Sequence, residues 1–303
     1  MGHDKIGIFV HGQHGDIALC TAVLKYKDIL WPGKDIVWYC GGTPEKASYV
    51  DMLKYNNLIS EVRDWPQEDF RNLINEKGQL RLERRGDFES MKDLHNGYFP
   101  APWAVLPNRL EGVNLEGVNY ANIPRIICGA DPSWEWHPYL CFSDEERDVA
   151  REFCLNLPYS KTIMLETQLR SAGDTRLGED VIKNIMQLCR NKLGDCNFIF
   201  ASKVDYPNFV SEKGVVSCSH FMIRQTALIH NYCHLFIGVS SGITVATSCW
   251  GNKPVPKISL CGSTTDYSII ANGPSTIVIG QDIPVPEKNR RLENAVAEVL
   301  NKL

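Results

Sequence analysis

Short apolar runs alternate with amphipathic segments along most of the 303 residues, and polar or glycine-rich loops separate them. Apolar runs rich in β-branched and aromatic residues predict buried strands, whereas apolar positions at helical spacing predict helices. In the first part of the chain these patterns predict strands at 5–10, 35–40, 59–62 and 125–128, and helices at 16–30 and 44–55. Residues 67–123 are charged and aromatic and predict few clear elements.

The alternation begins again after residue 142. Ser143 followed by Glu146 is a capping-box pattern, and it predicts the start of a helix that Pro158 ends. Beyond it we predict strands at 162–165, 197–201, 215–217, 234–237, 256–260 and 276–279, and helices at 178–190, 221–231, 242–250 and 286–302. Two such blocks predict an α/β protein with two Rossmann-like parallel-sheet domains, residues 1–157 and 158–285, facing a central cleft.

Composition narrows the class of protein. Hydrophobic residues make up 44% of the chain and charged residues 22%, which excludes a disordered or fibrous protein. The formal net charge of −4 gives no bulk attraction to nucleic acid or to an anionic membrane. We therefore expect no nucleic-acid partner.

The eleven cysteines are scattered, form no C-x-x-C pair and lie mostly in apolar runs. This usage is typical of reduced core cysteines in a cytosolic protein. The first apolar run, 6–10, is too short for a signal-peptide core or a membrane span. We therefore expect a soluble, cytoplasmic protein without a transmembrane segment.

The first loop of interest, HGQHGDI at 11–17, follows the first predicted strand. It is neither a dinucleotide fingerprint nor a P-loop, but it places two histidines and Asp16 where open α/β sheets bind ligands. Asp16 has two interpretations that the residues alone leave open. It is either an active-site carboxylate or an N-cap of the following helix.

The second loop, GVSSGIT at 238–244, lies between a predicted strand and a predicted helix. Small polar residues at a helix start offer backbone N–H groups and hydroxyls to a phosphate. The alternative interpretation is simple N-capping, which needs only Ser240 or Ser241. The accumulation of small residues favours anion binding.

These two loops carry a resemblance to a known family. The segment GDIALCTAVL at 15–24, with Trp31-Pro32 after it, resembles the opening of the heptosyltransferase-type glycosyltransferases, glycosyltransferase family 9. The segment IGVSSGIT at 237–244, with GNKP at 251–254, is similar to that family's donor loop. The chain departs from the family pattern where Ser240 replaces an aspartate, Val245 a histidine and Ala22 a proline.

The resemblance implies a GT-B fold with the final helix, in 286–303, packing back on the first domain. It also implies an inverting, metal-independent transfer of a sugar from a nucleotide-diphosphate donor to a glycan or glycolipid acceptor, with no cofactor, and it leaves peripheral membrane contact open. Asp16 corresponds to the family's proposed general base, and His14 is the rival candidate. A D-x-D motif is absent, which agrees with a mechanism that needs no divalent metal.

Further candidate residues follow from the same comparison of positions. The candidate donor-binding residues are Glu166, Thr167, Gln168, Arg170, Ser171, Arg176, Lys203, His220, Ser240, Ser241, Gly242, Ile243 and Thr244. For the arginines and Lys203, an ordinary solvated loop is the alternative. On the acceptor side we expect Gly15 and Trp103; Trp103, Trp134 and Trp136 either stack on a sugar or are buried core residues.

A zinc site is disfavoured. Its candidate ligands, Cys218, His220, His230, Cys233 and His234, lack the paired short spacings of structural zinc sites. Two other functions stay open beside sugar transfer. One is a nucleotide-sugar epimerase with the same double-Rossmann frame, and the other is a nucleotide-sugar-binding protein without catalytic activity, as the changes at Ser240 and Val245 would allow.

Overall fold

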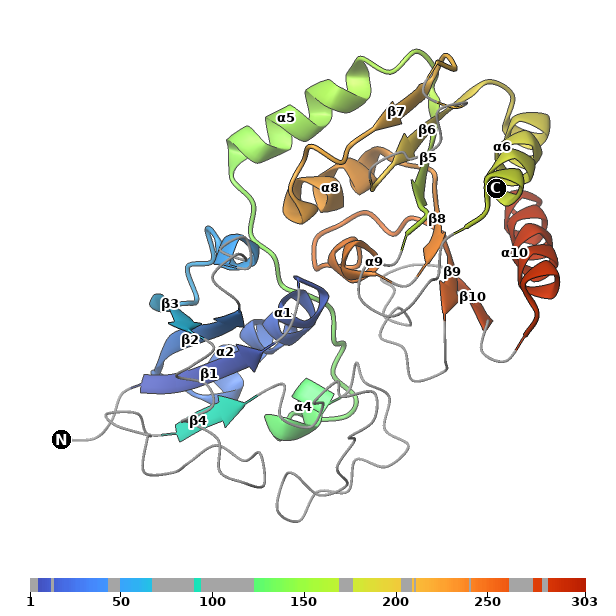
Figure 1. Ribbon diagram of the computed structural model, residues 1–303. Helices are drawn as coiled ribbons and strands as arrows, with labels where there is room; N and C mark the ends of the chain where they lie inside the picture. The colour runs from blue at the N-terminus through green and yellow to red at the C-terminus, as the bar shows by residue number, and fades with distance from the viewer. Residues whose placement is uncertain are drawn as a thin grey trace. The chain divides into compact units, whose positions relative to one another are not determined.

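The computed structural model describes residues 5–11, 14–42, 50–66, 90–93, 123–168, 177–202, 209, 211–239, 241–261, 275–279 and 283–303 (Figure 1). The chain divides into two compact units, Met1–Cys141 and Phe142–Leu303. The α/β class predicted from the sequence is confirmed in both units.

The first unit contains a four-stranded sheet in the order β3-β2-β1-β4. Its strands are β1 (Lys5–His11), β2 (Asp35–Gly42), β3 (Glu61–Pro66) and β4 (Ser90–Asp93). Every pairing in this sheet is parallel, as the predicted alternation of strands and helices requires. β4 lies in the stretch from which the sequence predicted few clear elements.

The segment predicted as one helix over 16–30 is three shorter pieces. These are α1 (His14–Cys20), a 3-10 helix (Thr21–Tyr26) and α2 (Lys27–Leu30). At the first junction, the Thr21 hydroxyl donates to the carbonyl of Ala18 at 2.6 Å and accepts from the backbone N–H of Tyr139 at 2.8 Å. A threonine that bonds back to its own helix bends the helix locally, and here a distant segment fixes that bend.

The predicted strand at 125–128 is wrong, because these residues form part of helix α4 (Ile123–Ile127). Pro124 in the first turn and Gly129, at a φ of +67°, bracket that helix. Proline near a helix start and glycine just after its end are the residues that helix termini favour. The helix predicted over 44–55 is described only from residue 50, where residues 50–53 form a 3-10 turn.

The second unit contains a six-stranded sheet in the order β10-β9-β8-β5-β6-β7, and all its pairings are parallel. The strands are β5 (Lys161–Glu166), β6 (Cys196–Phe200), β7 (Val215–Ser217), β8 (Leu235–Val239), β9 (Lys257–Cys261) and β10 (Ser275–Ile279). Numbered from β5, this is the doubly wound order 3-2-1-4-5-6.

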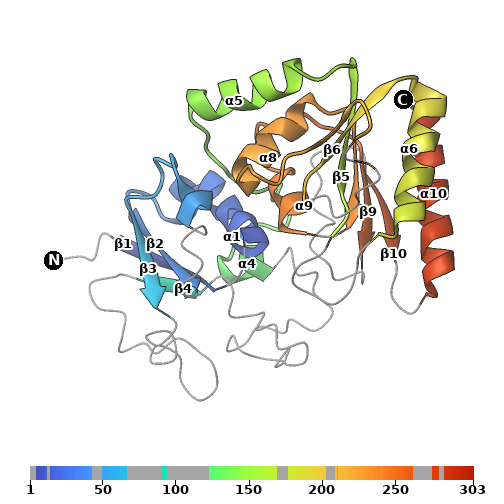
Figure 2. The ribbon, with the colours of Figure 1, turned by 45° about the horizontal axis from the view of Figure 1, so that its top comes forward.

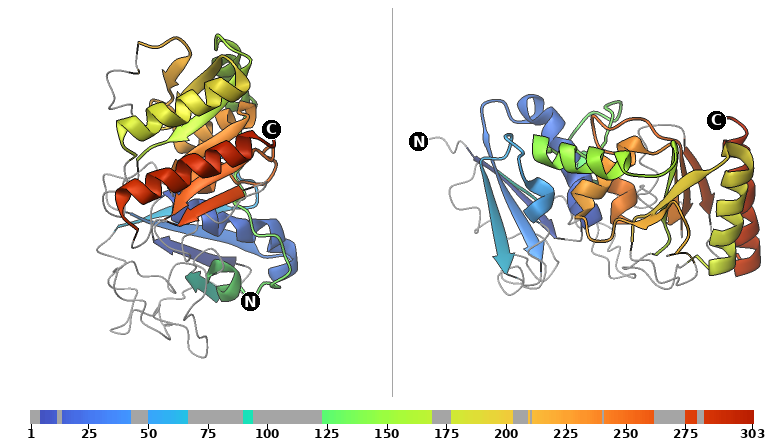
Figure 3. Two further views of the ribbon diagram at one scale, coloured as in Figure 1. Left: turned by 90° about the vertical axis from the view of Figure 1, so that its right-hand side faces the viewer. Right: turned by 90° about the horizontal axis from the view of Figure 1, so that it is seen from above.

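Helices cover both faces of this sheet (Figure 2). They are α5 (Asp144–Leu155), α6 (Glu179–Leu193), α8 (Ile223–Ile229), α9 (Gly242–Ala246) and α10 (Val285–Leu300). Figures 2 and 3 show α6 and α10 side by side on one face, and α5, α8 and α9 lie on the other. The second unit is therefore a three-layer α/β structure.

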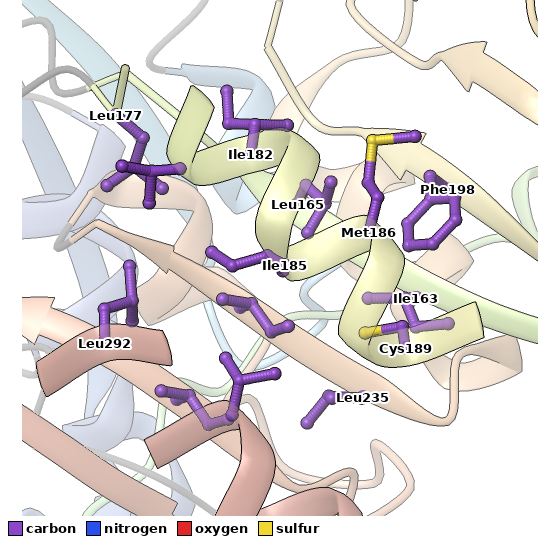
Figure 4. Close-up of a cluster of buried hydrophobic side chains, with 14 of the residues drawn as sticks. Ile163, Leu165, Leu177, Ile182, Ile185, Met186, Cys189, Phe198, Leu235 and Leu292 are labelled. Carbon is purple, nitrogen blue, oxygen red and sulfur yellow. The ribbon is translucent and has the colours of Figure 1, made fainter. Parts of the chain in front are cut away.

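The core of the second unit follows from strand alternation. On β5, Ile163 and Leu165 belong to the buried cluster beneath α6 and α10, whereas Met164 between them belongs to the cluster beneath α5 and α8. Figure 4 shows the first cluster, in which Ile182 and Ile185 of α6 lie over the strand residues. Parallel strands buried on both faces have this nearly continuous apolar character.

Helix α5 belongs to the second unit, although the predicted boundary at 157 placed it in the first. The predicted capping box is present: Ser143 Oγ accepts from the N–H of Glu146 at 3.1 Å, and Glu146 Oε2 accepts from the N–H of Ser143 at 3.0 Å. The same carboxylate accepts from Arg224 of α8 at 2.6 Å, and the arginine side chain is fully buried. This ion pair joins α5 to α8.

Helix α10 buries its apolar face in the core of the second unit, through Leu292, Ala295, Val296 and Leu300. The expectation that the final helix also packs on the first domain stays a prediction, as does the central cleft between the domains. No helix in the described part of the chain is long and apolar enough to cross a membrane.

Candidate functional site

The second sheet has a topological switch point between β5 and β8. The chain leaves β5 toward β6 and β7, and later returns to the other side of β5 to form β8, β9 and β10. In open α/β sheets, ligands bind outside the carboxyl ends of the strands at such a point. The residues at this edge are Glu166 to Gln168 at the end of β5, and Val239, Ser241 and Gly242 at the end of β8. Two of the predicted donor-binding segments therefore meet here.

The carboxyl ends of β5 and β8 approach each other closely because of Gly238. Glu166 is the register partner of Gly238, and a Cβ added to the glycine would lie 2.7 Å from the Glu166 Cβ and 2.8 Å from its carbonyl oxygen. Only glycine allows this approach without displacement. The Glu166 side chain is buried and accepts from the backbone N–H of Gln168 at 3.1 Å. Its carboxylate therefore shapes the turn after β5.

Thr167 carries a buried polar atom at the same edge. The residue is 1% exposed, and its hydroxyl has no hydrogen-bond partner in the described part of the chain. Its carbonyl accepts from the N–H of Leu177 at 3.1 Å, so the backbone after β5 is held in place. A buried hydroxyl without a partner costs free energy, so a ligand that completes its hydrogen bonds would be favoured.

The loop after β8 is organised around Ser241 and Thr244. Ser241 is the N-cap of α9, and its hydroxyl accepts from the N–H of Thr244 at 3.3 Å. Thr244 is fully buried and donates its hydroxyl to the carbonyl of Val239 at 2.9 Å. The capping interpretation therefore holds for Ser241. Gly242 and Ile243 are only partly buried, and the two hydroxyls hold the backbone around them in shape.

A buried lysine lies under the other end of α9. Lys257 is 1% exposed, and its ammonium group donates to Ser248 Oγ at 2.6 Å. Ser248 Oγ in turn donates to the carbonyl of Thr244 at 3.2 Å. Burial lowers the pKa of Lys257 to about 7, since the apolar surroundings disfavour its charged form. This chain of hydrogen bonds connects the interior of the sheet to the loop after β8.

His220 lies on the same side of the sheet as the switch point, but at the edge strand. It follows β7, is exposed, and packs against Phe221 and Phe153, with ring centroids 4.1 Å and 6.4 Å away. In the strand order, β6 separates β7 from β5. His220 can therefore reach only an extended ligand that also occupies the switch point.

The first sheet has its own switch point, between β1 and β4. Helix α1 begins at His14, so Asp16 lies in the first helical turn instead of at the N-cap position. Gly15 is buried, while His14 and Asp16 are partly exposed. A carboxylate in a first turn is stabilised by the helix dipole. The two candidate bases are thus next to the carboxyl end of β1, where the sequence predicted them.

Six predicted site residues lie outside the described residues: Arg170, Ser171, Arg176, Lys203, Ser240 and Trp103. Two other tryptophans of the acceptor hypothesis stack on Tyr26, with ring centroids 4.4 Å away for Trp134 and 6.1 Å away for Trp136. Trp136 is 7% exposed, which agrees with the core interpretation for that residue.

The candidate zinc ligands are part of the core or its surface. Cys218 and Cys233 lie in the apolar cluster beneath α5 and α8, and burial raises the pKa of Cys218 to about 12. His230 is fully buried, neither of its ring nitrogens has a hydrogen-bond partner among the described residues, and burial holds its pKa well below the ordinary value. Within the described ranges, no group of three or more His, Cys, Asp or Glu residues is arranged to hold a metal ion.

Gly238, at this edge, and Lys257, at the amino end of β9, were not among the predicted site residues. An isolated glycine inside a strand pattern indicates close backbone approach, so Gly238 carried a usable signal. Lys257 carried none, because a lysine at the start of a strand ordinarily indicates an exposed end.

Together, the strand order and the two loops at its switch point define a doubly wound, Rossmann-like α/β architecture. No family model and no curated protein matches the sequence. Several solved structures match the fold of this chain. A glycosyl transferase family 9 protein from Veillonella parvula matches with a TM-score of 0.66 at 14% identity, over 99% of this chain and 98% of that one.

Two E. coli enzymes give the same result. ADP-heptose LPS heptosyltransferase II matches with a TM-score of 0.66 at 11% identity, over 98% of this chain and 99% of that one. Heptosyltransferase WaaC, solved with ADP, matches with a TM-score of 0.60 at 12% identity over the same shares. The chain has the fold of the GT-B, heptosyltransferase-like glycosyltransferases. The resemblance seen in the two loops is confirmed at the level of the fold.

Proposed function

We propose that the protein is a glycosyltransferase that moves a sugar from a nucleoside-diphosphate donor to a glycan or glycolipid hydroxyl. One observation carries the proposal: Glu166 and Gly238 are register partners at the switch point of the second sheet. Two loops that are far apart in the sequence, and that each resemble donor-binding segments, are therefore neighbours at the edge where such sheets bind nucleotides.

The donor diphosphate would lie against the exposed backbone at the start of α9. Gly242 and Ile243 offer N–H groups there, and Ser241 and Thr244 hold the loop in shape. The Thr167 hydroxyl is a further donor at the same edge. Two of the structures with this fold are described as an ADP-heptose enzyme and an enzyme solved with ADP, which supports a nucleotide-sugar donor.

We infer that Asp16 acts as the general base, with His14 as the rival. In an inverting transfer, the acceptor hydroxyl gives its proton to the carboxylate while its oxygen attacks the anomeric carbon. The bond from that carbon to the diphosphate oxygen breaks on the opposite face, and the leaving diphosphate keeps the electron pair. Backbone N–H groups stabilise the charge that develops on it, so the proposal requires no metal ion.

The acceptor is the less defined partner, and a glycolipid acceptor would bring the protein to a membrane surface in the cytoplasm.

A defined experiment tests the donor first. ADP, UDP and GDP are compared by thermal shift, because a ligand at ~100 times its dissociation constant stabilises the native state by about 2.7 kcal/mol. The matching nucleotide-sugar is then incubated with glycan acceptors in EDTA, and the anomeric configuration of the product is determined by NMR.

We expect transfer with inversion in the presence of EDTA. Conversion of the nucleotide-sugar without an acceptor would identify an epimerase instead. Tight nucleotide binding without turnover on any acceptor would identify a binding protein. Either outcome contradicts the proposal.

A substitution tests the donor loop itself. Gly242→Val should abolish nucleotide binding, because the branched side chain crowds the backbone that meets the diphosphate, whereas Ser241→Ala should weaken binding only modestly. Isothermal titration calorimetry with the nucleotide that binds measures both. Ser211→Val, in an exposed turn before β7, is the control and should bind normally. Unchanged affinity in the Gly242 variant would exclude the loop.

A further inference from the structure

A pocket lies at the opposite edge of the second sheet from the switch point. Its volume is about 250 Å³, and it is lined by Lys161, Leu193, Cys233, His234, Lys253, Val255, Pro256 and Leu303. Lys161 is the first residue of β5 and His234 precedes β8, so this is the amino-end edge of the strands. Doubly wound sheets bind their usual ligands at the carboxyl ends of the strands, so a ligand at the amino ends would occupy a separate site.

Three nitrogen groups line this basic pocket. The exposed Lys161 and Lys253 contribute ammonium groups, and His234 contributes its imidazole. His234 Nδ1 accepts from the backbone N–H of Thr162 at 3.3 Å, which places the proton of the neutral ring on Nε2. Each of the three side chains is therefore a hydrogen-bond donor.

These groups have no carboxylate partner in the described ranges. Neither Lys161 nor Lys253 forms an ion pair with a described acidic residue, and Leu303, the last residue of the sequence, makes none with them. The two lysines act on His234 with the same sign, and together with burial they lower its pKa. A bound anion would offset this repulsion between the two lysines and the His234 ring.

The rest of the wall is apolar. Leu193 at the end of α6 and Val255 and Pro256 before β9 contribute hydrocarbon surface. A small number of polar groups in an otherwise apolar cavity is the usual composition of a small-molecule site. The volume of about 250 Å³ is below the ~300–1,000 Å³ common for drug-sized ligands, which favours a ligand smaller than a whole nucleotide.

We propose that this basic pocket is a second ligand site, distinct from the switch point, that binds a small organic anion. Its ligand carries a phosphate or carboxylate head held by Lys161, Lys253 and His234, and a short apolar part that packs on Leu193, Val255 and Pro256. The site goes beyond the proposed sugar transfer, and it does not depend on that activity.

The test titrates the full chain with phenyl phosphate, benzoate and uncharged phenol by isothermal titration calorimetry. We expect saturable one-to-one binding of at least one anion and none of phenol. The relative affinity of the two anions assigns the head group as phosphate or carboxylate. In parallel, NMR follows the His234 ring, assigned with His234→Gln, whose pKa should rise when the bound anion stabilises the imidazolium against Lys161 and Lys253.

A double variant, Lys161→Gln with Lys253→Gln, should weaken binding ~tenfold or more, because it removes both charged hydrogen-bond donors to the anion. Lys183→Gln with Lys288→Gln removes the same charge from α6 and α10, away from the basic pocket, and should bind the anion normally. Nucleotide binding should be unchanged in both variants, which separates this site from the proposed function. No saturable binding of either anion, or equal affinity in the two double variants, would overturn the proposal.

Discussion

Asp16 shows how the role of one carboxylate depends on where its helix begins. The sequence left two interpretations open, active-site base or N-cap. Because α1 begins at His14, Asp16 is in the first turn and the cap position lies before it. The interaction of its charge with the helix dipole, which is worth about 0.3–1 kcal/mol, is therefore one structural contribution of Asp16.

Asp16→Asn separates the two roles. If Asp16 accepts the acceptor's proton, the variant keeps its fold and donor affinity but loses turnover by ~10²-fold or more. The melting temperature should fall only slightly, since the lost dipole interaction is small. Melting temperature, nucleotide affinity and sugar transfer are measured together, with His14→Ala beside it as the matched control. Near-normal turnover in Asp16→Asn combined with a large loss of turnover in His14→Ala would show that His14, not Asp16, is the base.

Gly238 is the residue on which the approach of β5 and β8 depends. Gly238→Ala should destabilise the protein by ~1–3 kcal/mol, because the new Cβ would lie 2.7–2.8 Å from Glu166 atoms and one strand must move. Urea unfolding measures this change. Nucleotide affinity should fall as well, since the same displacement spreads the two loops.

Gly178→Ala is the control for that substitution. Gly178 is the N-cap of α6 with a φ of −65°, and a Cβ there would meet nothing within 4 Å. This change should cost less than Gly238→Ala, because the lower conformational freedom of alanine in the unfolded chain partly offsets its weaker preference for the N-cap position. An equal loss of stability in the two variants would show that the strand contact at Gly238 is not the cause.

At the scale of elements, α9 is held by the buried Lys257 through Ser248. The folded-state pKa of this lysine is about 7, below its ordinary value of 10.5. Between these values the unfolded chain binds more protons at this lysine than the folded one, so the contribution of Lys257 to the free energy of unfolding should rise as pH increases from about 7 toward 10. The buried cysteines, whose pKa values are raised, oppose this rise equally in the wild type and in Lys257→Met. In Lys257→Met this rise should be reduced relative to the wild type.

Urea unfolding at pH 7, 8 and 9 compares the two proteins. This window lies above the titration of His230, the histidine that faces Lys257, because burial and the lysine hold its pKa well below its ordinary value. Ser248→Ala is the companion variant: it removes the hydrogen bond but keeps the lysine, so it should lower stability and retain the pH dependence. Parallel pH profiles for wild type and Lys257→Met would contradict this account.

The central strands β5, β6 and β8 of the second sheet could be predicted from sequence because they are buried on both faces. β7 was predicted with its observed bounds at 215–217, and the other five within a few residues. Continuous apolar runs such as 162–165 are a local signal, so no knowledge of the partner strand is needed. The capping box at Ser143 could be predicted for the same reason, because its residues are close together in the sequence.

The incorrect secondary-structure predictions concern features that depend on distant residues or on competing local signals. The apolar residues at 126–128 fit a strand pattern, but Pro124 and Gly129 favour the two ends of a helix at this position. The helix predicted over 242–250 ends at Ala246, where the hydroxyls of Thr247 and Ser248 both bond to the carbonyl of Thr244. Serine and threonine compete with the helix backbone in this way.

At the scale of the whole molecule, both sheets share the strand order 3-2-1-4, and the second extends it by two strands. This order is what gives each unit a switch point beside its first strand. The candidate site was predictable as two separate loops, since each follows a recognisable strand. That Glu166 and Gly238 are neighbours was not, because it depends on β8 pairing with β5 across the intervening strands and helices.

The division of the chain predicts that residues 142–303 fold alone. Both buried clusters of this unit draw all their members from that range, including those of α5 and α10. A chain of residues 142–303 should therefore unfold cooperatively in urea, and under the proposed function it should bind the same nucleotide as the full protein. Circular dichroism and calorimetry measure the two properties separately.

A shorter chain, residues 158–303, begins at the boundary predicted from the sequence and lacks α5. It leaves the fully buried Arg224 without Glu146, and breaking a buried ion pair costs ~3–5 kcal/mol. It also exposes the apolar surface that Ala150 covers. We expect it to be much less stable than residues 142–303, or unfolded. Equal stability of the two chains would place the boundary after α5, and an unfolded 142–303 chain would show that the second unit needs the first to fold.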